Sequence, residues 1–372
     1  MFGLIIFTLV LVLLSVSFSS RSSSVEEDAD VSLEVKIGQM LMVGFRGLEL
    51  DDPSPIIQDI EEFHLGGVIL FDYDLVHQKA LRNIQSPVQL GALTADLQRA
   101  AAVPLLIAID HEGGVITRLK ESYGFPPTVS HQYLGILDDP ATTYRESEKM
   151  AKTLAAVGIN LNLAPVLDLK VNPDNPIIAH YERSFSKDPS LVTRHALEFI
   201  RAHHMQGILC TPKHFPGHGS STEDSHIGFV DITDTWSRME LEPYRDLIKA
   251  QSVEAIMTAH VFNAHLDPGY PATLSQATVT GLLRDELGFT GVVISDDIQM
   301  KAIAEHYGFE TAIRKALEAG VDILLIANNN EYDEGIVKRT FCLIQRFVDE
   351  GVVSEARIDQ SYQRIRKLKM LL

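Results

Sequence analysis

The segment from Lys213 to His226 has the highest density of side chains that could take part in chemistry. It runs Lys213-His214-Phe215-Pro216-Gly217-His218-Gly219 and continues through Ser220 to Asp224-Ser225-His226. Three histidines and two acidic residues in so short a stretch are compatible with a metal site. However, His214 is expected to leave a strand and His218 follows a Pro-Gly turn, so the two do not have the spacing of a helical pair of ligands. We therefore favour chemistry without a metal, and the sequence implies no cofactor.

Asp224 and His226 form an Asp-x-His arrangement within this segment. A carboxylate so placed can orient an imidazole and raise its proton affinity, and the imidazole can then protonate a leaving oxygen and later deprotonate a water. If the segment belongs to a sugar-binding site, Lys213 and His214 would donate hydrogen bonds to sugar hydroxyls. Two alternatives stay open: His226 packs or caps locally, or Glu223 in the same loop is the acid.

A second segment ends an apolar run with two carboxylates, Asp296 and Asp297, after Val292-Val293-Ile294-Ser295. A carboxylate at the end of a buried strand has a fixed backbone and a low-dielectric setting, which suits a nucleophile that must meet an anomeric carbon. Neighbouring Asp residues point to different sides, so one is expected to enter a site while the other caps or braces. An Asp pair after a strand can also be only a helix cap.

A third segment is Ile109-Asp110-His111-Glu112-Gly113-Gly114-Val115-Ile116-Thr117-Arg118. The Gly pair permits a tight backbone turn. Asp110 could accept hydrogen bonds from neighbouring sugar hydroxyls, and Arg118 could reach back as a donor.

The elements that must position these residues repeat one pattern from Leu33 onward: a short aliphatic run, a polar or glycine-containing loop, and an amphipathic helix. Such alternation indicates βαβ units and a parallel sheet. The predicted strands are Met40–Phe45, Gly67–Phe71, Leu105–Ile109, Leu161–Leu167, Ile208–Lys213, Ala255–His260, Val292–Ser295 and Asp322–Ala327. Helical patterns follow them, including 141–157, 190–205, 311–319 and 332–349.

Eight such units predict an α/β fold, a single (β/α)8 barrel of the TIM type over residues 33–372. In these barrels the chemistry lies at the carboxyl ends of the strands. The unusual polar residues fall there, namely Asp110, Asp168, Lys213 with His214, His260, and Asp296 with Asp297. The pattern therefore favours a site at this end of the barrel.

The composition excludes some classes of protein. The formal net charge of −18 leaves no Lys/Arg cluster that could displace phosphate counterions, so nucleic acid is not an expected partner. Cys210 lies in an apolar run and is expected to be a small buried side chain; one distant pair with Cys342 is not a disulfide framework. The sequence does not predict an oligomeric state.

The first twenty residues differ in kind from the rest. Residues 2–18 are almost wholly apolar, and small residues follow where a signal peptidase could cut. We predict a cleaved signal peptide or an uncleaved membrane anchor over residues 1–20, followed by a polar spacer over 21–32. In either case the barrel is expected outside the cytoplasm: periplasmic, extracellular or attached to a membrane through the N-terminus.

Taken together, these segments resemble glycoside hydrolase family 3, specifically its bacterial β-N-acetylglucosaminidase branch that acts on peptidoglycan fragments. The resemblance rests on K-H-F-P-G-H-G with D-S-H following, S-D-D-x-x-M, I-D-x-E-G-G, and the segments Glu182-Arg183-Ser184-Phe185 and Met257-Thr258-Ala259-His260. It covers nearly everything from Leu33 to the C-terminus.

The resemblance implies a role for each matching residue. Asp296 would be the nucleophile of a retaining mechanism, with His226 as the acid/base and Asp224 as its partner, on a loop that closes over the substrate in relatives. Sugar contacts would come from Asp110, Arg118, Arg183, Lys213 and His214. Val115 and His111 depart from the family pattern, which puts contacts on the leaving-group side in doubt. Because the chain ends after the barrel, we expect no second domain to supply an acid, and the proton donor must come from the barrel itself.

The implied activity is release of terminal non-reducing β-linked N-acetylglucosamine, from peptidoglycan-derived fragments or chitooligosaccharides. Other interpretations remain: a β-glucosidase or xylosidase of the same family, a non-catalytic binder of wall fragments, substrate-assisted catalysis by the acetamido group, and phosphate in place of water as acceptor.

Overall fold

The computed structural model describes residues 31–51 and 53–372, and Leu33–Leu372 form one compact unit. The predicted signal peptide or anchor and nearly all of the predicted spacer lie outside the described residues, so both stay predictions. Among the helices that the structure does describe, none combines the length and the apolar character needed to cross a bilayer.

Eight parallel strands follow one another in chain order, as expected for a (β/α)8 barrel. They are β1 (Leu41–Gly44), β2 (Gly67–Leu70), β5 (Leu106–Ile109), β8 (Leu161–Asn162), β9 (Leu209–Cys210), β11 (Ala255–Met257), β13 (Val292–Ile294) and β14 (Leu324–Ile326). Six form a sheet in the order β14-β1-β2-β5-β8-β9, and β11 pairs with β13. Two backbone bridges, Phe215 to Thr258 and Ile294 to Ile323, join that pair to the two ends of the sheet. The predicted fold class is therefore confirmed.

Each of the eight strands pairs regularly over a shorter stretch than predicted, and β8 and β9 are shortened the most. β8 and β9 pair over two residues each, Leu161 with Leu209 and Asn162 with Cys210. Pro165 and Pro212 follow within a few residues. Because proline has no N–H to donate, the regular ladder stops there. The chain stays extended beyond the prolines, and Val166 and Lys213 form a further parallel bridge.

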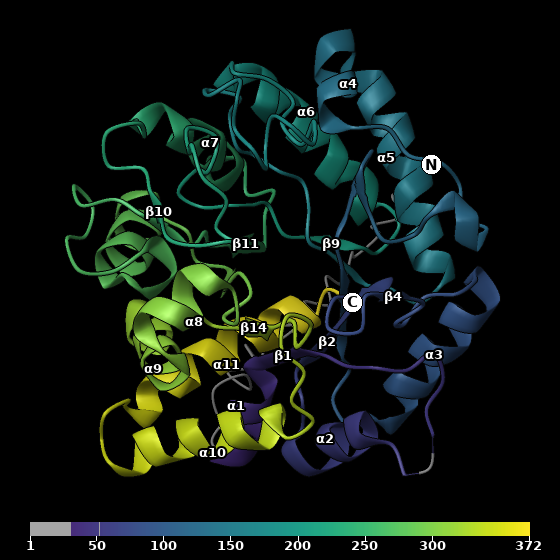
Figure 1. The fold of residues 1–372 in the computed structure, drawn as a ribbon, viewed down its shortest axis with the longest axis vertical. Coiled ribbons are helices and arrows are strands. Elements are labelled where there is room, and N and C mark those ends of the chain that lie inside the picture. The colour runs from purple at the N-terminus through teal and green to yellow at the C-terminus, as the bar shows by residue number, and fades with distance from the viewer. Residues whose placement is uncertain (1–30, 52) are drawn as a thin grey trace, which may run out of the picture. The chain divides into compact units, whose positions relative to one another are not determined.

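Helices surround the strands in the same order (Figure 1). The outer layer consists of α2 (Pro55–Phe63), α3 (Pro87–Ala100), α5 (Pro140–Ala156), α6 (Pro189–His204), α7 (Glu242–Lys249), the π-helical segment Ala277–Glu286, α9 (Phe309–Ala319) and α10 (Ile336–Asp349). Three of them begin with a polar cap followed by proline: Ser86, Asp139 and Asp188 each accept a backbone N–H with their side chains. The fixed φ of proline suits the first helical position, where its missing N–H costs nothing.

The remaining elements complete the unit. They are α1 (Leu33–Gln39), α4 (His131–Leu137), α8 (Lys301–Tyr307), α11 (Glu355–Lys369), the hairpins β3–β4 (Tyr73–Asp74, Lys79–Ala80) and β6–β7 (His111–Gly113, Ile116–Thr117), the parallel pair β10–β12 (Val230–Asp231, Val261–Phe262), and three 3-10 turns (Glu121–Tyr123, Arg238–Leu241, Ala272–Leu274). The hairpins, β10–β12 and α8 follow the carboxyl ends of barrel strands, so they build up the face where a site is expected.

The two cysteines are free. Cys210 on β9 is buried and Cys342 on α10 is exposed. The prediction that Cys210 is a small buried side chain is confirmed.

Candidate active site

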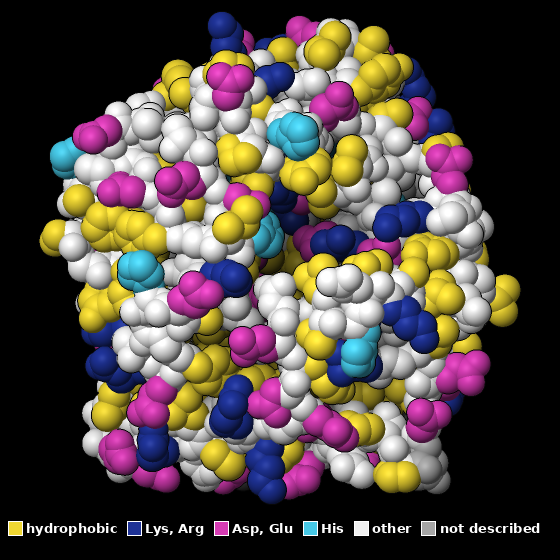
Figure 2. Space-filling view, in the orientation of Figure 1, with side chains coloured by type: hydrophobic (Ala, Val, Ile, Leu, Met, Phe, Trp, Pro, Cys, Tyr) yellow, Lys and Arg dark blue, Asp and Glu magenta, His cyan; other side chains and the backbone are white. Residues whose placement is uncertain are grey.

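A cavity of about 480 Å³ is lined by residues that follow the carboxyl ends of the barrel strands. Figure 2 shows it as a hollow near the centre of this face, with acidic and basic side chains in its floor. All eight residues to which the resemblance assigned a catalytic or sugar-binding role line it: Asp110, Arg118, Arg183, Lys213, His214, Asp224, His226 and Asp296. They come from segments spread between residues 110 and 296, and the barrel brings them together.

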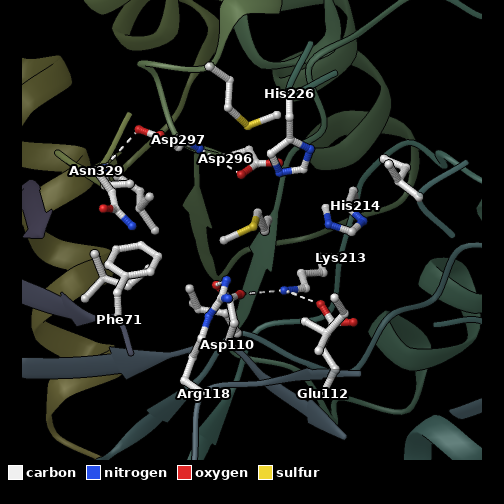
Figure 3. A pocket seen from close by; sticks show the side chains of 18 of the residues that line it. Phe71, Asp110, Glu112, Arg118, Lys213, His214, His226, Asp296, Asp297 and Asn329 are labelled. Carbon is white, nitrogen blue, oxygen red and sulfur yellow. Dashed lines mark hydrogen bonds and ion pairs between the residues drawn. The ribbon is translucent and has the colours of Figure 1, made fainter. Parts of the chain in front are cut away.

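The candidate nucleophile, Asp296, lies two residues beyond the end of β13 and is half-buried. Its Oδ1 atom accepts the N–H of Asp297 at 2.8 Å. The carboxylate of Asp297 accepts the N–H groups of Gln299 and Ala327 at 3.1 and 2.9 Å. Both acids line the cavity. Asp297, however, braces the ends of β13 and β14, whereas the Asp296 carboxylate lies next to the His226 ring in the view of Figure 3 and interacts with it electrostatically.

The electrostatic surroundings shift the pKa values of the two acids in opposite directions. Burial opposes ionisation of Asp296, but the imidazoles of His260, His214 and His226 lower its pKa below the ordinary value. Burial and the negative charge of Asp296 raise the pKa of Asp297 to about 6. Asp296 is therefore the carboxylate that carries a stable negative charge into the cavity.

The candidate acid/base, His226, lies on loop 217–229, which follows the Lys213–Phe215 segment. Its Nδ1 atom is 2.7 Å from Oδ1 of Asp224, and its backbone N–H donates to the same oxygen at 2.8 Å. The His226 side chain is 58% exposed, whereas that of Asp224 is 21% exposed. With Nδ1–H held by Asp224, the Nε2 atom is left to face a ligand.

Burial disfavours the charged imidazole of His226, but the hydrogen bond to Asp224 and the charge of Asp296 raise its pKa above the ordinary value. The carboxylate of Asp296 stays ionised and the imidazole of His226 stays protonated in the same pH range. Groups whose environments separate their pKa values in this way suit the roles of nucleophile and acid.

Five charged side chains line the cavity at the mouth of the barrel, and we call them the mouth cluster: Asp110, Glu112, Arg118, Arg183 and Lys213. Lys213 Nζ lies 2.8 Å from Asp110 and 2.7 Å from Glu112 (Figure 3). Arg118 contacts the second oxygen of Asp110 at 3.3 Å. Burial opposes ionisation of Asp110, but Lys213 and Arg118 lower its pKa to about 2. A fixed set of charged donors and acceptors of this kind can hold neighbouring sugar hydroxyls.

Glu112 is the member of the mouth cluster to which the sequence assigned no role. Its two oxygens accept from Nε and Nη2 of Arg183, each at 2.8 Å. Burial opposes its ionisation, but Arg183 and Lys213 lower its pKa far below the ordinary value. The signal was present, because Glu112 stands two residues after Asp110 in the third segment. What the sequence could not give was the partner, since Arg183 lies 71 positions away.

Asp168 fixes His214 from behind. Its Oδ2 atom lies 2.6 Å from Nδ1 of His214, and its Oδ1 atom accepts the backbone N–H groups of His214 and His218 at 3.3 and 2.8 Å. Asp168 is buried and does not line the cavity. His214 in turn presents Nε2 at 3.2 Å from Nη2 of Arg183.

The rim of the cavity was not predicted. Tyr73 and Leu75 belong to the hairpin after β2, and Asn329 and Asn330 follow β14; all four line the cavity. Asn329 joins the two sides, since its Oδ1 accepts the N–H of Leu75 at 3.1 Å and its Nδ2 donates to Tyr73 O at 3.1 Å. Isolated residues of these types carry no signal in a sequence.

Other expected or doubtful positions lie away from the cavity. His260, a polar residue at a strand end, is buried against Thr273 and the carbonyl of Asp297 and does not line it. The two departures from the family pattern, His111 and Val115, are not lining residues either. Glu223, the alternative acid, is exposed and is likewise absent from the lining, whereas Asp224 and His226 are part of it.

The metal alternative receives no support from the geometry. Within residues 31–51 and 53–372, no group of three or more His, Cys, Asp and Glu side chains could hold a metal ion. The histidines of the first segment are engaged elsewhere: His214 with Asp168, and His218 with the hydroxyls of Ser221 and Ser225 at 2.7 and 3.1 Å.

The barrel and the charged cavity at the carboxyl ends of its strands define the protein as a (β/α)8-barrel protein with a candidate active site. The model of the glycosyl hydrolase family 3 N-terminal domain matches residues 32–368. The chain therefore belongs to glycosyl hydrolase family 3.

Relatives of known name agree with this assignment. A β-hexosaminidase from Tolumonas auensis is 39% identical over 294 residues, which are 78% of this chain and 83% of the relative. β-Hexosaminidase A from Pseudoalteromonas piscicida is 32% identical over a 395-residue alignment, and this covers 96% of this chain but 64% of the relative.

Solved structures give the same picture. A family 3 β-N-acetylglucosaminidase from a Paenibacillus species matches with a TM-score of 0.83 and 39% identity, covering 92% of this chain and 62% of that one. A β-N-acetylhexosaminidase from Beutenbergia cavernae matches with a TM-score of 0.81 and 30% identity, covering 92% of this chain and 99% of that one. The chain thus spans almost all of one neighbour and less than two thirds of the other.

Proposed function

We propose that the protein is a retaining β-N-acetylhexosaminidase that removes terminal non-reducing β-linked N-acetylglucosamine. Its family and its relatives, which are named as β-hexosaminidases and β-N-acetylglucosaminidases, support this activity. The observation that carries the proposal is that the Asp296 carboxylate and an imidazole held by Asp224 line one cavity.

The proposed reaction has two displacements. Asp296 attacks the anomeric carbon while the bond to the leaving oxygen breaks, and that oxygen takes the Nε2 proton of His226. A water then attacks the anomeric carbon, its proton passes to Nε2, and the Asp296 carboxylate leaves. Two inversions retain the configuration. Retaining glycosidases usually have two carboxyl groups about 5 Å apart. That spacing does not apply here, because an imidazole replaces one of the two groups.

The mouth cluster would hold the sugar during both steps. Asp110 and Arg118 face the cavity with side chains 18% and 31% exposed, so they can accept from and donate to neighbouring hydroxyls. Lys213 and Arg183 neutralise the acids and fix their positions. Because these groups are set before the substrate arrives, little reorganisation is needed on binding.

The natural substrate is proposed to be a peptidoglycan-derived fragment or a chitooligosaccharide. The apolar stretch at residues 2–18 supports an enzyme that works outside the cytoplasm, where wall fragments occur. A comparison of N-acetylglucosamine release from N-acetylglucosaminyl muropeptides and from diacetylchitobiose would choose between the substrates. Fractionation of cells that express the chain with and without residues 1–20 tests the location.

The acid assignment is tested by leaving-group dependence. His226→Ala should lower kcat/KM on diacetylchitobiose by roughly 10²–10⁴-fold, because that leaving group needs a proton. The loss on a 4-nitrophenyl glycoside should be much smaller. Equal losses on both substrates would contradict the role of His226. Glu223→Gln is the matched control in the same loop. A large loss of kcat/KM on diacetylchitobiose for this variant alone would identify Glu223 as the acid.

The covalent step has its own test. A fluorosugar inactivator of the N-acetylglucosamine type should label the wild-type enzyme at Asp296, and peptide mapping by mass spectrometry locates the label. An unlabelled Asp296 under conditions in which the enzyme turns over would instead support participation of the acetamido group.

A further inference from the structure

Loop 217–229 is fixed firmly at its beginning. The N–H of Gly219 donates to Oε2 of the buried Glu240 at 3.1 Å. Asn175 donates to the carbonyl of His218 at 2.8 Å, and Asn172 donates to the carbonyl of Ser221 at 2.8 Å. The first five residues of the loop therefore have a defined position against the barrel.

The part of the loop that bears His226 is held mainly by itself. Residues 222, 223, 226 and 227 are exposed, and Ile227 is 72% exposed. The carbonyl of Asp224 accepts the N–H groups of Ile227 and Gly228 at 3.0 and 3.2 Å, which closes a tight turn around His226. These bonds hold the turn together, so its position depends on what holds its two ends.

At the first end of the turn, the buried hydroxyl of Ser225 lies 3.1 Å from Nε2 of His218. At the other end, the ring of Phe229 stacks on His306, with centroids 4.9 Å apart and planes at 22°. Phe229 also makes a tilted contact with Phe262 on β12, with ring centroids 5.2 Å apart.

His306 belongs to the helix that follows the candidate nucleophile. α8 begins at Lys301, five residues after Asp296, and its preceding residue Met300 lines the cavity. The stack of Phe229 on His306 therefore ties the segment that carries His226 to the segment that carries Asp296. Aromatic rings in offset stacks prefer a defined separation, so the contact fixes a distance as well as burying area.

We propose that Phe229 and His306 form a clasp that positions His226 against Asp296, and that both are positioning residues for the proton-transfer step. The inference rests on the proposed function, in which His226 protonates the leaving oxygen. Neither ring lines the cavity. Both act through the turn 224–228, so losing the clasp misplaces the acid while Asp296 and the mouth cluster stay in position.

The test compares Phe229→Ala and His306→Ala in the full-length enzyme, with kcat/KM on diacetylchitobiose and on a 4-nitrophenyl glycoside. This parameter covers the steps up to departure of the leaving group. Misplacement of a reacting group by about 1 Å can cost up to roughly 10²-fold. We expect losses of about tenfold on diacetylchitobiose and of less than about threefold on the aryl glycoside. Phe229→Tyr and His306→Phe, which keep a ring on each side, should retain most of the wild-type ratio between the two substrates.

Tyr144→Ala is the matched control for removal of a half-buried aromatic ring. Tyr144 on α5 lies under the guanidinium of Arg201 on α6, at 4.4 Å, and does not line the cavity. Tyr144→Ala should leave the ratio of the kcat/KM values on the two substrates unchanged. The thermal unfolding midpoint of each variant shows that the protein compared is folded, and His306→Ala, at an exposed helical position, keeps the test available if Phe229→Ala does not fold.

A double-mutant cycle separates the clasp from the proposed function. If Phe229 acts through His226, then Phe229→Ala should cause no further loss on diacetylchitobiose once His226 is already alanine. The same additional loss with and without His226, or equal losses of the clasp variants on both substrates, would overturn the clasp alone. Equal losses of His226→Ala on both substrates would overturn the proposed acid and the clasp with it.

Discussion

Two clusters of buried charged side chains lie at opposite ends of the barrel, and they differ in what their hydrogen bonds hold. The mouth cluster follows the carboxyl ends of the strands and lines the cavity. The second cluster, which we call the base cluster, precedes β14 at the amino end. It consists of Asp322, Arg284, Arg357 and Arg364.

The base cluster is directed at the protein itself. Asp322 is fully buried, and it accepts the N–H of Val293 at 2.9 Å and the hydroxyl of Ser361 at 2.7 Å. Arg284 donates to the carbonyls of Gly291 and Gly320. Arg357 donates to the carbonyls of helix α9 and the loop that follows it. These bonds fasten α11 and the π-helical segment to the starts of β13 and β14.

In the mouth cluster, by contrast, polar atoms are directed into the cavity. Arg118 and Asp110 pair with each other and still face the cavity. The comparison teaches that burial and ion pairing do not by themselves mark a site, because both clusters have them. The orientation toward a cavity marks it, in agreement with the division of barrels into a catalytic carboxyl face and a stabilising amino face.

The largest difference between the two ends of the barrel is expected when one carboxylate is removed from each of them. Asp296→Asn should abolish hydrolysis, by at least about 10⁴-fold in kcat, because in the proposed mechanism Asp296 is the group that forms the glycosyl-enzyme. The loss should be the same for activated and unactivated substrates, and the unfolding midpoint should stay close to that of the wild type. An active Asn variant would remove Asp296 from the mechanism.

Asp322→Asn is the counterpart at the base. It leaves three arginines without their carboxylate, and loss of one partner of a buried pair costs about 3–5 kcal/mol of folding free energy. We expect that loss in urea unfolding, with kcat/KM of the folded enzyme unchanged at low temperature. A variant of wild-type stability but reduced kcat/KM would mean that the base cluster acts on the site.

A smaller effect comes from a matched pair of arginines. Arg118 and Arg364 have side chains 31% and 25% exposed, and they contact Asp110 and Asp322 at 3.3 and 3.0 Å, respectively. Arg118 also lies 3.9 Å from Asp72. Arg118→Ala should lower kcat/KM about 10–100-fold through loss of a charged hydrogen bond to the sugar, with little change in stability. Arg364→Ala should show the reverse pattern, with about 1 kcal/mol lost in urea unfolding and kcat/KM retained. Identical patterns would erase the distinction between the clusters.

The smallest expected effect is a shift of the pH profile. His226 must be protonated to act as acid, so kcat/KM on diacetylchitobiose should fall as pH rises through its pKa. Asp224 raises this pKa above the ordinary value of 6.5. Asp224→Asn keeps a hydrogen-bond acceptor but removes the charge, so the alkaline limb should move to lower pH. An unmoved limb would show that another group sets it.

Much of this fold is readable from the sequence because its signals are local. Each buried strand is a short aliphatic run, each helix has its own period and cap, and eight repeats of the pattern leave one closed arrangement. The lengths of the strands were overestimated at 161–167 and 208–213, although Pro165 and Pro212 stand in both stretches. The apolar run continues through Pro165, and a prediction from hydrophobicity alone takes no account of the missing N–H of either proline.

The candidate site was readable to the extent that polar side chains at strand ends point to one edge of the barrel. Asp110, Lys213 and Asp296 do line the cavity, but Asp168 and His260, chosen by the same argument, support it from outside. The position of a residue at the end of a strand shows at which edge of the barrel it lies. The direction of its side chain, however, depends on the groups that it contacts.

The sequence by itself therefore determined the barrel, the face that carries the cavity and the residues available there, because periodicity and residue type are properties of short segments. Only the tertiary structure decided which groups meet: Glu112 with Arg183, Asp168 with His214, and Phe229 with His306. These partners lie far apart in the chain, and a hydrogen bond or a ring contact needs separations correct to a fraction of an ångström. Closure of the barrel sets those separations, and no single segment contains that information.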